Sequence, residues 1–456
     1  MKMSWIITRR TTTLSIVSDL LISIFIYYSV FQEKFGSNPK TIVPVLFAFF
    51  WIIGSYILGR YIKIKTINFG SIINSILKTI LLLILCNIIY FFINLFFPLL
   101  IFSDSINQNF FSIKLSSVFI KISFYIAIVS LIVQSVFNIL YNKINNNKNN
   151  WIFLGTYYKY KKILKEMKVK EKEITLKMLS INKNIDENDL KNVKGIIIED
   201  YKKISKFNID KIFELKTRGL KVESLLSWFE REFQRIPTDI LKNKYQLVTR
   251  INSLEDNYQL RFKRIIDINF SLILLLITSP LCLLISLLIV LEDNGPIFYS
   301  QIRTGQNGKR IKIIKFRSMK IDAEKDGIQW SKKFDPRITK VGRIIRATRL
   351  DEIPQLICVI RGSMSLIGPR PERPEIEEKY LEELAFYKLR YLLKPGLSGW
   401  AQVSFRYGAS VLDTKKKLSY DIYYISHFSI LLDLLIFFKT LKLVLNAKGS
   451  SPQNDI

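Results

Sequence analysis

The sequence predicts a chain of three parts: a helical membrane bundle, an α/β domain, and a basic C-terminal domain with a further apolar helix. Length and composition support this division. A chain of 456 residues with 49% hydrophobic residues and a formal net charge of +30 is too long for one ordinary domain and too apolar to be wholly soluble. Long apolar runs occupy the first part, and strand-like and helix-like segments alternate after Trp151.

The N-terminal part contains four apolar runs, each long enough to cross a bilayer. They lie near residues 14–31, 42–58, 72–101 and 118–141. The first has no small-residue cleavage site and further runs follow it, which favours a retained helix over a removed signal peptide. Basic residues lie before the first run, between the second and third, and after the fourth: Lys2, Arg9, Arg10, Arg60, Lys63, Lys65, Lys143 and Lys148. By the positive-inside rule, both ends of this four-helix domain, residues 1–142, are expected in the cytoplasm.

A polar segment rich in Asn and Lys, residues 142–150, precedes the second part. Three strand-like segments alternate there with a basic helix-like segment, residues 158–167, which predicts a parallel sheet. The strands are expected at residues 151–155, 174–181 and 195–199. A dinucleotide site needs several glycines after the first strand, so that the backbone can approach a pyrophosphate. Only Gly155 stands there, which favours a structural or regulatory use over nucleotide binding.

Residues 265–291 are apolar enough to span a membrane, but Ser279-Pro280 interrupts the run near its middle. Proline removes a helical hydrogen bond and bends the axis. The run is therefore either a fifth spanning helix with a kink or a re-entrant helix that enters and leaves on the cytoplasmic side. Basic residues flank it on both sides: Lys263, Arg264, Arg303, Lys309, Arg310, Lys312, Lys315 and Arg317. A spanning helix would export the second group, so re-entry is favoured.

The stretch from Arg346 to Pro371 contains an adjacent carboxylate pair, Asp351-Glu352. Pro354 is favoured in the first turn of a helix, so the pair is expected at a helix start, where the dipole keeps Asp351 ionised. Arginines flank the pair at positions Arg346, Arg349, Arg361 and Arg370. Carboxylates among arginines indicate phosphoryl chemistry with a metal ion. The alternative is an ordinary helix start with surface salt bridges.

This pattern resembles the signature of the bacterial sugar transferase family, the monotopic polyprenyl-phosphate hexose-1-phosphate transferases. Further motifs of the family occur in its order and cover about residues 261–446. They are K-R-I-I-D at 263–267, G-P-I-F-Y-S-Q-I-R-T-G at 295–305, K-F-R-S-M at 315–319 and K-P-G-L-S-G-W-A-Q-V at 394–403. One departure is Ser363, where many members carry Asp in Gly-Asp-Met-Ser.

The resemblance implies an α+β monotopic phosphoglycosyl transferase domain at residues 256–456, with its re-entrant helix at 265–291. It also implies a Rossmann-like cytoplasmic domain at residues 143–255. Such an enzyme transfers a hexose-1-phosphate from a UDP-sugar to undecaprenyl (polyprenyl) phosphate, releases UMP, and uses Mg²⁺. The expected location is the bacterial inner (cytoplasmic) membrane, with the catalytic domain on the cytoplasmic face. The reaction would initiate exopolysaccharide, capsule or O-antigen synthesis.

The resemblance also assigns roles to single residues. Asp351 is the expected nucleophile, which forms a covalent phosphosugar intermediate, and Glu352 assists with Mg²⁺ or proton handling; both are the expected metal ligands. Phosphate is expected to bind Arg346 and Arg370. Weaker candidates for nucleotide or phosphate contact, with lipid headgroups as an equal alternative, are Arg303, Lys315 and Arg317. A UDP-hexose is the preferred donor and a UDP-N-acetylhexosamine the alternative, while the oligomeric state stays open.

Other classes of function fit less well. A single histidine, His427, excludes paired-His zinc sites, and the three cysteines, Cys86, Cys282 and Cys358, lack disulfide or metal spacing. The basic residues accompany apolar runs rather than a nucleic-acid motif, so membrane lipids and phosphates are the expected partners and nucleic acid is not. A processive membrane glycosyltransferase typically holds its metal through Asp-x-Asp, which is absent here. A membrane-anchored nucleotide-binding scaffold would leave residues 261–446 unexplained.

Overall fold

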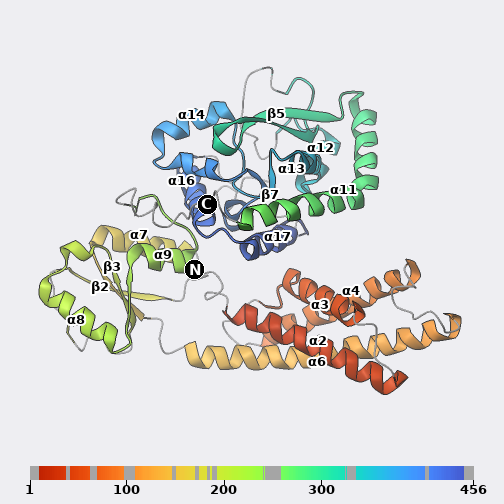
Figure 1. The fold of residues 1–456 in the computed structure, drawn as a ribbon, viewed down its shortest axis with the longest axis horizontal. Coiled ribbons are helices and arrows are strands. Elements are labelled where there is room, and N and C mark those ends of the chain that lie inside the picture. Colours follow the sequence, from red (N-terminus) through yellow and green to blue (C-terminus); the bar gives the residue numbers. More distant parts are fainter. Residues whose placement is uncertain are drawn as a thin grey trace. The chain divides into compact units, whose positions relative to one another are not determined.

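In a computed structural model, the chain divides into two compact units, Met1–Leu225 and Leu226–Ile456 (Figure 1). The structure describes residues 10–36, 42–61, 69–96, 108–145, 150–169, 174–181, 185–186, 193–239, 241, 258–323, 325, 335–405 and 410–445.

The first unit begins with four apolar helices, as the sequence predicts. They are α2 (Arg10–Phe35), α3 (Ile42–Ile57), α4 (Phe69–Phe96) and α6 (Gln108–Asn145). Three of them contain apolar stretches of 24, 18 and 23 residues, long enough to cross a membrane. The fourth, α3, has 16 residues and therefore extends about 24 Å, slightly less than the hydrocarbon thickness of a bilayer. The chain is thus a multi-pass membrane protein.

A buried polar network joins these helices. Asp19 of α2 is fully buried and lies 3.7 Å from the guanidinium of Arg60, which follows α3. The Asp19 carboxylate accepts hydrogen bonds from Ser130 on α6 (2.6 Å) and from Tyr61 (2.9 Å), and Arg60 donates to Thr79 on α4 (3.1 Å). Because a charge in apolar surroundings is costly unless it is paired, this network favours one arrangement of the four helices.

The first unit continues with a parallel four-stranded sheet of order β2-β1-β3-β4, which confirms the predicted α/β domain. Its strands are β1 (Asn150–Leu154), β2 (Thr175–Leu179), β3 (Val193–Ile198) and β4 (Lys221–Ser224). Between them lie α7 (Tyr157–Val169), η2 (Tyr201–Lys203) and α8 (Lys206–Thr217). The two helices cover opposite faces of the sheet (Figure 1), because the chain leaves the central strands in opposite directions. Branched side chains of β1 and β3, such as Ile152 and Ile196, form the core.

The second unit is an α+β domain, as the resemblance implies. It has an antiparallel hairpin, β5 (Phe298–Thr304) and β6 (Arg310–Phe316), and a parallel pair, β7 (Ser365–Ile367) and β8 (Gly396–Ser398). Its longer helices are α9 (Leu225–Phe233), α11 (Tyr258–Asp293), α12 (Lys340–Ala347), α13 (Gln355–Arg361), α14 (Pro374–Glu383), α16 (Val411–Ser426) and α17 (Ile430–Leu445). Shorter turns are η3 (Gln306–Gly308), η4 (Leu350–Glu352), η5 (Tyr387–Leu392) and α15 (Trp400–Ser404).

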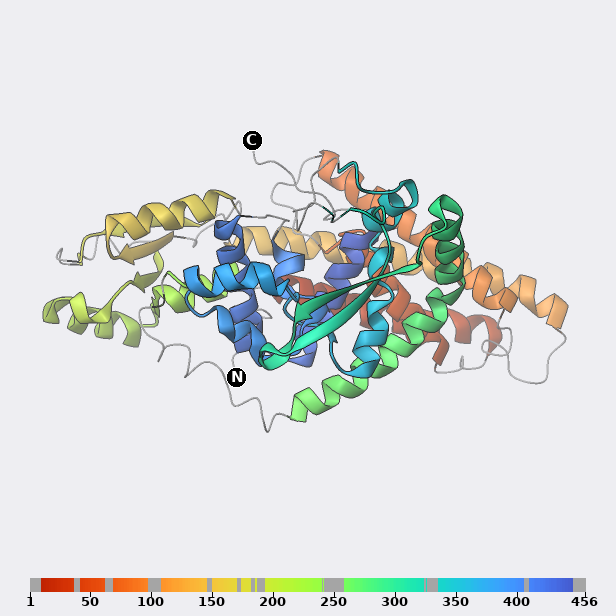
Figure 2. The ribbon, with the colours of Figure 1, turned by 90° about the horizontal axis from the view of Figure 1, so that it is seen from above.

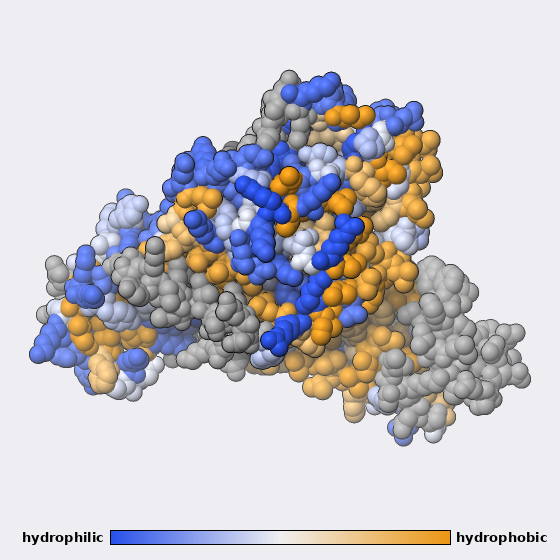
Figure 3. All heavy atoms as spheres, turned by 45° about the horizontal axis from the view of Figure 1, so that its top comes forward, coloured by the Kyte–Doolittle hydropathy of each residue, from blue (hydrophilic) through white to orange (hydrophobic). Residues whose placement is uncertain are grey.

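Helix α11 is the longest apolar helix of this unit, with 36 residues and Pro280 inside it. Ser279 precedes the proline, and its hydroxyl donates to the carbonyl of Leu276 (2.8 Å). Figures 1 and 2 both show the helix bent into two limbs that run in different directions. The second limb exposes large apolar side chains, including Leu283 (73%) and Leu291 (70%). Hydrophobic side chains gather at the corresponding edge of the molecule in Figure 3.

Both ends of α11 are bound to the same unit. Near the start, Lys263 pairs with Asp433 of α17 (2.5 Å), and Asp267 accepts a hydrogen bond from Ser365 of β7 (2.7 Å). At the end, Asp293 accepts from Arg317 (2.7 Å), and Glu292 accepts from the backbone of Lys340 at the start of α12 (2.6 Å). The bend therefore brings the two ends of an apolar helix back to one α+β domain.

Candidate active site

The carboxylate pair lies on the short turn η4, between α12 and α13. Arg349 precedes this turn with a φ of 61°, a conformation that non-glycine residues rarely adopt. Pro354 stands at the N-cap of α13, so the pair precedes that helix instead of occupying its first turn. The charge states of Asp351 and Glu352 therefore depend on burial and on neighbouring cations.

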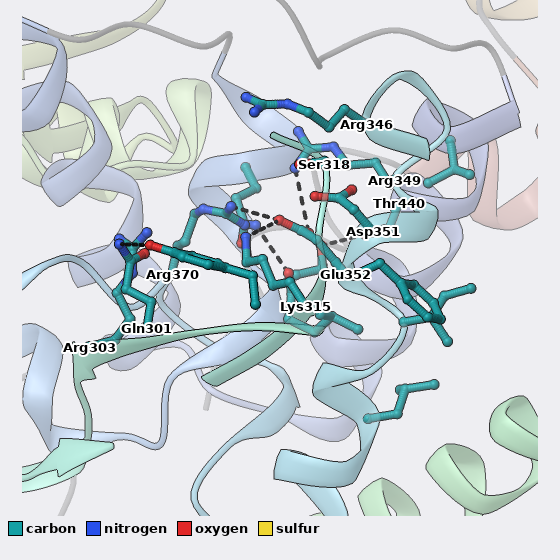
Figure 4. A pocket seen from close by; sticks show the side chains of 18 of the residues that line it. Gln301, Arg303, Lys315, Ser318, Arg346, Arg349, Asp351, Glu352, Arg370 and Thr440 are labelled. Carbon is teal, nitrogen blue, oxygen red and sulfur yellow. Dashed lines mark hydrogen bonds and ion pairs between the residues drawn. The ribbon is translucent and has the colours of Figure 1, made fainter. Parts of the chain in front are cut away.

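Glu352 is buried and surrounded by three cations. Its Oε1 accepts hydrogen bonds from Arg370 (2.7 Å) and from Lys315 of β6 (3.2 Å), and its Oε2 lies 3.6 Å from a guanidinium nitrogen of Arg349. Burial alone would raise the pKa of Glu352, but the charges of Arg370, Lys315 and Arg349 hold that pKa well below its usual range. Glu352 is thus a fixed anion that orients the cations around it (Figure 4).

Asp351 differs from its neighbour. Within the part of the chain that the structure describes, no group donates a hydrogen bond to its carboxylate. Burial and the adjacent charge of Glu352 raise the pKa of Asp351, while Lys315, Arg346 and Arg349 act in the opposite direction. Figure 4 shows Arg346 and Arg349 beside Asp351. The site therefore holds one carboxylate in place and leaves the other available.

The other predicted cations separate into two groups. Arg303 lines the same pocket, lies 3.8 Å from Glu372, and donates to the carbonyl of Pro371 (3.4 Å). Burial lowers the pKa of Arg303 to about 10. Arg317 also touches the pocket, but its guanidinium is held by Asp293 at the end of α11.

The pocket around Asp351 has a volume of about 1220 Å³. Its lining is of two kinds. The polar residues include Arg303, Lys315, Arg346, Arg349, Asp351, Glu352 and Arg370. The apolar residues come from several elements and include Leu274 of α11 and Phe437, Leu441 and Val444 of α17. Charged ligand groups and an apolar chain can therefore enter the same cavity.

The donor atoms at this site fit a hard cation. Among the residues with described positions, no group of three acidic, His or Cys side chains could hold a metal ion alone. Mg²⁺, however, is commonly bound by one or two carboxylates together with substrate phosphates. The Asp351 carboxylate and the more weakly engaged Oε2 of Glu352 match that donor set.

The contacts that hold the backbone of Arg370 in place were not predicted from the sequence. Arg390 of η5 donates to the carbonyl of Arg370 (2.7 Å) and to Asp421 of α16 (2.8 Å), and its guanidinium also contacts the hydroxyl of Tyr387 (2.5 Å). No local motif joins Arg370, Arg390 and Asp421, because they come from segments that meet only in the folded unit. Of the flanking arginines, Arg361 is exposed at the last turn of α13 and does not line the pocket.

The middle domain has its own anion position, at the N-terminus of α7. Glu199, just after β3, accepts hydrogen bonds from the backbone N–H (2.6 Å) and hydroxyl (3.0 Å) of Thr156 and pairs with Lys159 (2.9 Å). Burial would raise the pKa of Glu199, but these contacts lower it. A protein carboxylate therefore occupies the place where a Rossmann-type domain binds a phosphate.

Comparison with known proteins places the chain in a family. The family described as bacterial sugar transferase matches residues 258–447. A UDP-N-acetylgalactosamine-undecaprenyl-phosphate N-acetylgalactosaminephosphotransferase of Aeromonas hydrophila is 44% identical over 188 residues, which are 41% of this chain and 44% of the relative. An exopolysaccharide production protein of Rhizobium leguminosarum bv. phaseoli is 40% identical over 184 residues, which are 39% of this chain and 92% of the relative. The chain belongs to the bacterial sugar transferase family.

A third relative shows the same extent of similarity. A UDP-glucose:undecaprenyl-phosphate glucose-1-phosphate transferase of Escherichia coli (strain K12) is 40% identical over 180 residues, which are 39% of each chain. The chain thus spans less than half the length of this relative and of the Aeromonas protein. The matched region contains η4, α11, α17 and the whole polar lining of the pocket.

Proposed function

We propose that this chain transfers a sugar-1-phosphate from a UDP-sugar to undecaprenyl phosphate and releases UMP. The observation that carries this proposal is the Asp351 carboxylate, to which no described residue donates a hydrogen bond, beside the cation-bound Glu352 in a pocket with both charged and apolar lining. A nucleotide-sugar diphosphate repels an attacking carboxylate, so the surrounding cations are needed before Asp351 can approach phosphorus.

The reaction consists of two displacements at one phosphorus. An Asp351 oxygen attacks the sugar-bearing phosphorus, the bond from that phosphorus to the bridging oxygen breaks, and UMP leaves. An oxygen of undecaprenyl phosphate then attacks the same phosphorus, and the bond to Asp351 breaks, which restores the carboxylate. Arg370 and Arg346 hold phosphate oxygens, and Lys315 and Arg303 add charge. Arg317, held by Asp293, supports the end of α11.

Mg²⁺, held by Asp351 and Glu352 with phosphate oxygens, would neutralise the charge of the diphosphate. The apolar lining from α11 and α17 fits the prenyl chain of the acceptor. The same reaction would initiate exopolysaccharide synthesis, as the name of the Rhizobium relative suggests. In this assignment residues 1–142 form the membrane domain, and the middle domain begins at 143 and the catalytic domain continues to 456. The sequence predicts their boundary at 255/256, but residues 226–239 pack with the second unit, which begins at Leu226.

A screen of purified UDP-sugars for released nucleotide tests the reaction class and the donor together. UMP release supports the proposal, whereas UDP indicates a glycosyltransferase and no nucleotide indicates a scaffold. The relatives include glucose and N-acetylgalactosamine transferases, so both UDP-hexoses and UDP-N-acetylhexosamines belong in the screen. Reaction with N-acetylated donors alone would refute the preferred UDP-hexose.

Mass spectrometry after incubation with donor alone tests the covalent step. The two-displacement scheme predicts a phosphosugar on Asp351 and one equivalent of UMP without acceptor. A direct attack by undecaprenyl phosphate on the donor predicts neither until acceptor is present. Wild-type protein that turns over with acceptor but shows no adduct and no early UMP would refute the covalent intermediate.

The membrane topology is the second part of this proposal. Attachment of both ends of α11 to one α+β domain supports a re-entrant helix with both ends on the cytoplasmic side of the bacterial inner membrane. Cysteines introduced for Tyr258 and Asn294 in a background without Cys86, Cys282 and Cys358 test this. Both should resist an impermeant reagent added outside intact cells. Labelling at position 294 alone would show a fifth span.

Pro280→Leu should straighten the helix and increase the labelling at position 294.

A further inference from the structure

Residues 226–239, which we name the strap, pack against the catalytic unit. Four large side chains of the strap are almost fully buried: Trp228, Phe229, Phe233 and Ile236. The backbone N–H of Ile236 donates to the carbonyl of Ser419 on α16 (2.8 Å), and Glu230 pairs with His427 at the end of α16 (3.2 Å). Asp239 forms a further ion pair with Lys415. The strap is thus bound along the length of α16.

The strap also reaches Trp400, the first residue of α15. The indole N–H of Trp400 donates to the backbone carbonyl of Gln234 (2.8 Å), and Gln234 adopts a φ of 53°. Trp400 is 1% exposed, with the ammonium of Lys439 4.3 Å from its ring centre and Tyr423 stacked on it. A buried indole held from three sides has a fixed position.

Trp400 adjoins the loop that carries Arg370. Gly399 packs directly on the carbonyl of Gly368, too closely for a side chain at position 399. The N–H of Gly368 donates to Ser398 (2.8 Å), and the N–H of Gly396 donates to Pro369 (2.9 Å). Arg370 follows immediately and bonds Glu352. A continuous series of contacts therefore runs from the strap through Trp400 to the phosphate-binding arginine.

We propose that Trp400 is a positioning residue: its hydrogen bond to Gln234 lets the strap fix the loop Gly368–Arg370 and thereby the affinity of the site for phosphate. The strap continues from the last strand of the middle domain without a linker, since β4 ends at Ser224 and α9 begins at Leu225. The strap is thus a buried segment at the start of the second unit. This inference rests on the proposed function, because it concerns the same pocket.

A double-mutant cycle on UMP affinity, measured by calorimetry with the full-length protein, tests this role. Trp400→Phe keeps an aromatic ring but loses the N–H, so UMP affinity should fall about fivefold, the equivalent of one hydrogen bond. Arg370→Lys should weaken UMP binding more strongly, because it removes the bidentate fork. If the strap acts through Arg370, Trp400→Phe should cost less than about twofold in the Arg370→Lys background.

Two further variants keep the test decisive. Trp228→Phe makes the same chemical change in the strap core and should leave UMP affinity within about twofold. If Trp400→Phe does not fold, Glu230→Gln takes its place in the test. It weakens the contact of the strap with α16 without changing α15, and it should lower UMP affinity by about two- to threefold. If Trp400→Phe lowers UMP affinity by the same factor in the wild type and in the Arg370→Lys background, the positioning role alone is overturned. Wild-type protein that does not bind UMP would overturn both this role and the proposed function.

Discussion

Two regions of this chain hold a carboxylate among cations. They differ in whether protein groups bind every carboxylate of the site. In the middle domain, Glu199 is bonded to the start of α7 and to Lys159. In the catalytic unit, Glu352 binds three cations while Asp351 accepts no hydrogen bond from any described residue. In the middle domain, protein groups already bind the carboxylate, and no ligand is needed to balance it.

In the catalytic unit, one carboxylate of the pair is left for a ligand. Among the described residues that line the pocket, basic side chains outnumber acidic ones: the acidic residues are Asp351, Glu352, Glu372 and Asp421, and the basic residues include Arg303, Lys315, Arg346, Arg349 and Arg370. The Lys315 ammonium is largely withdrawn from water, and this burial lowers its pKa. An anionic substrate relieves that excess of positive charge. A carboxylate at a helix start or among arginines therefore indicates a reaction site only when a second carboxylate beside it stays available as a nucleophile.

The largest effect is expected at Asp351. Asp351→Asn keeps the size of the side chain but removes its charge and nucleophilicity, so UMP release should fall by about three or more orders of magnitude. Thermal unfolding should change little, because no described residue donates a hydrogen bond to this carboxylate. Asp210→Asn, at an exposed position of α8, serves as the control and should retain activity. Substantial UMP release by Asp351→Asn would refute its role as nucleophile.

Glu352→Gln should affect both stability and rate. It leaves Lys315 and Arg370 without their buried anion, and we expect a loss of about 3 kcal/mol in the free energy of unfolding. Because the folded pKa of Glu352 is depressed, its stabilisation is present at neutral pH and is lost as pH falls through that pKa. Turnover should be slow, but the phosphosugar should still form on Asp351.

Thermal unfolding at neutral pH and at low pH provides the measurement for Glu352. The difference between wild type and Glu352→Gln should shrink toward low pH. Glu375→Gln, at an exposed position of α14, should change stability by less than about 0.5 kcal/mol. Equal stability of wild type and Glu352→Gln at neutral pH would show that the three cations do not depend on this carboxylate.

The pH dependence of UMP release should identify what controls Asp351. The pKa of Asp351 is raised and its ionised form is needed. Activity should therefore be lost on acidification at a higher pH than for a free Asp, which titrates at about 3.9. Arg346→Gln removes a charge that stabilises ionised Asp351, so it should shift the loss of activity to higher pH. Glu352→Gln removes a neighbouring negative charge and should shift it to lower pH. Arg361→Gln, outside the pocket, should leave it unchanged; a shift there equal to that of Arg346→Gln would contradict the assignment.

The smallest effect is expected in the middle domain. Glu199→Gln weakens the contact with Lys159 and should cost about 1–2 kcal/mol of stability, while UMP release and UMP affinity should stay within about twofold. Thermal unfolding and the UMP-release assay measure the two effects separately. A large loss of activity without a loss of stability would show that this carboxylate belongs to the reaction and would remove the contrast between the two regions.

The sequence alone determined the parts of this protein that depend on local composition. Apolar runs of bilayer length gave the membrane helices, and the alternation of strands and helices gave the parallel sheet, because both patterns are set by neighbouring residues. The adjacent pair Asp351-Glu352 and the motifs around it gave the family. Pro280 indicated an interruption in α11, and both ribbon views show the bend.

Only the tertiary structure decided which charges face one another. Lys315 lies on β6 and reaches Glu352, whereas Arg317, two residues later, follows the end of the strand and turns to Asp293. Side chains two residues apart share a face only while the strand continues, and β6 ends at Phe316. Similarly, Arg390 and the segment Gly396–Gly399 reach the loop of Arg370 from separate parts of the chain. Such contacts depend on the packing of distant elements, which no local pattern encodes.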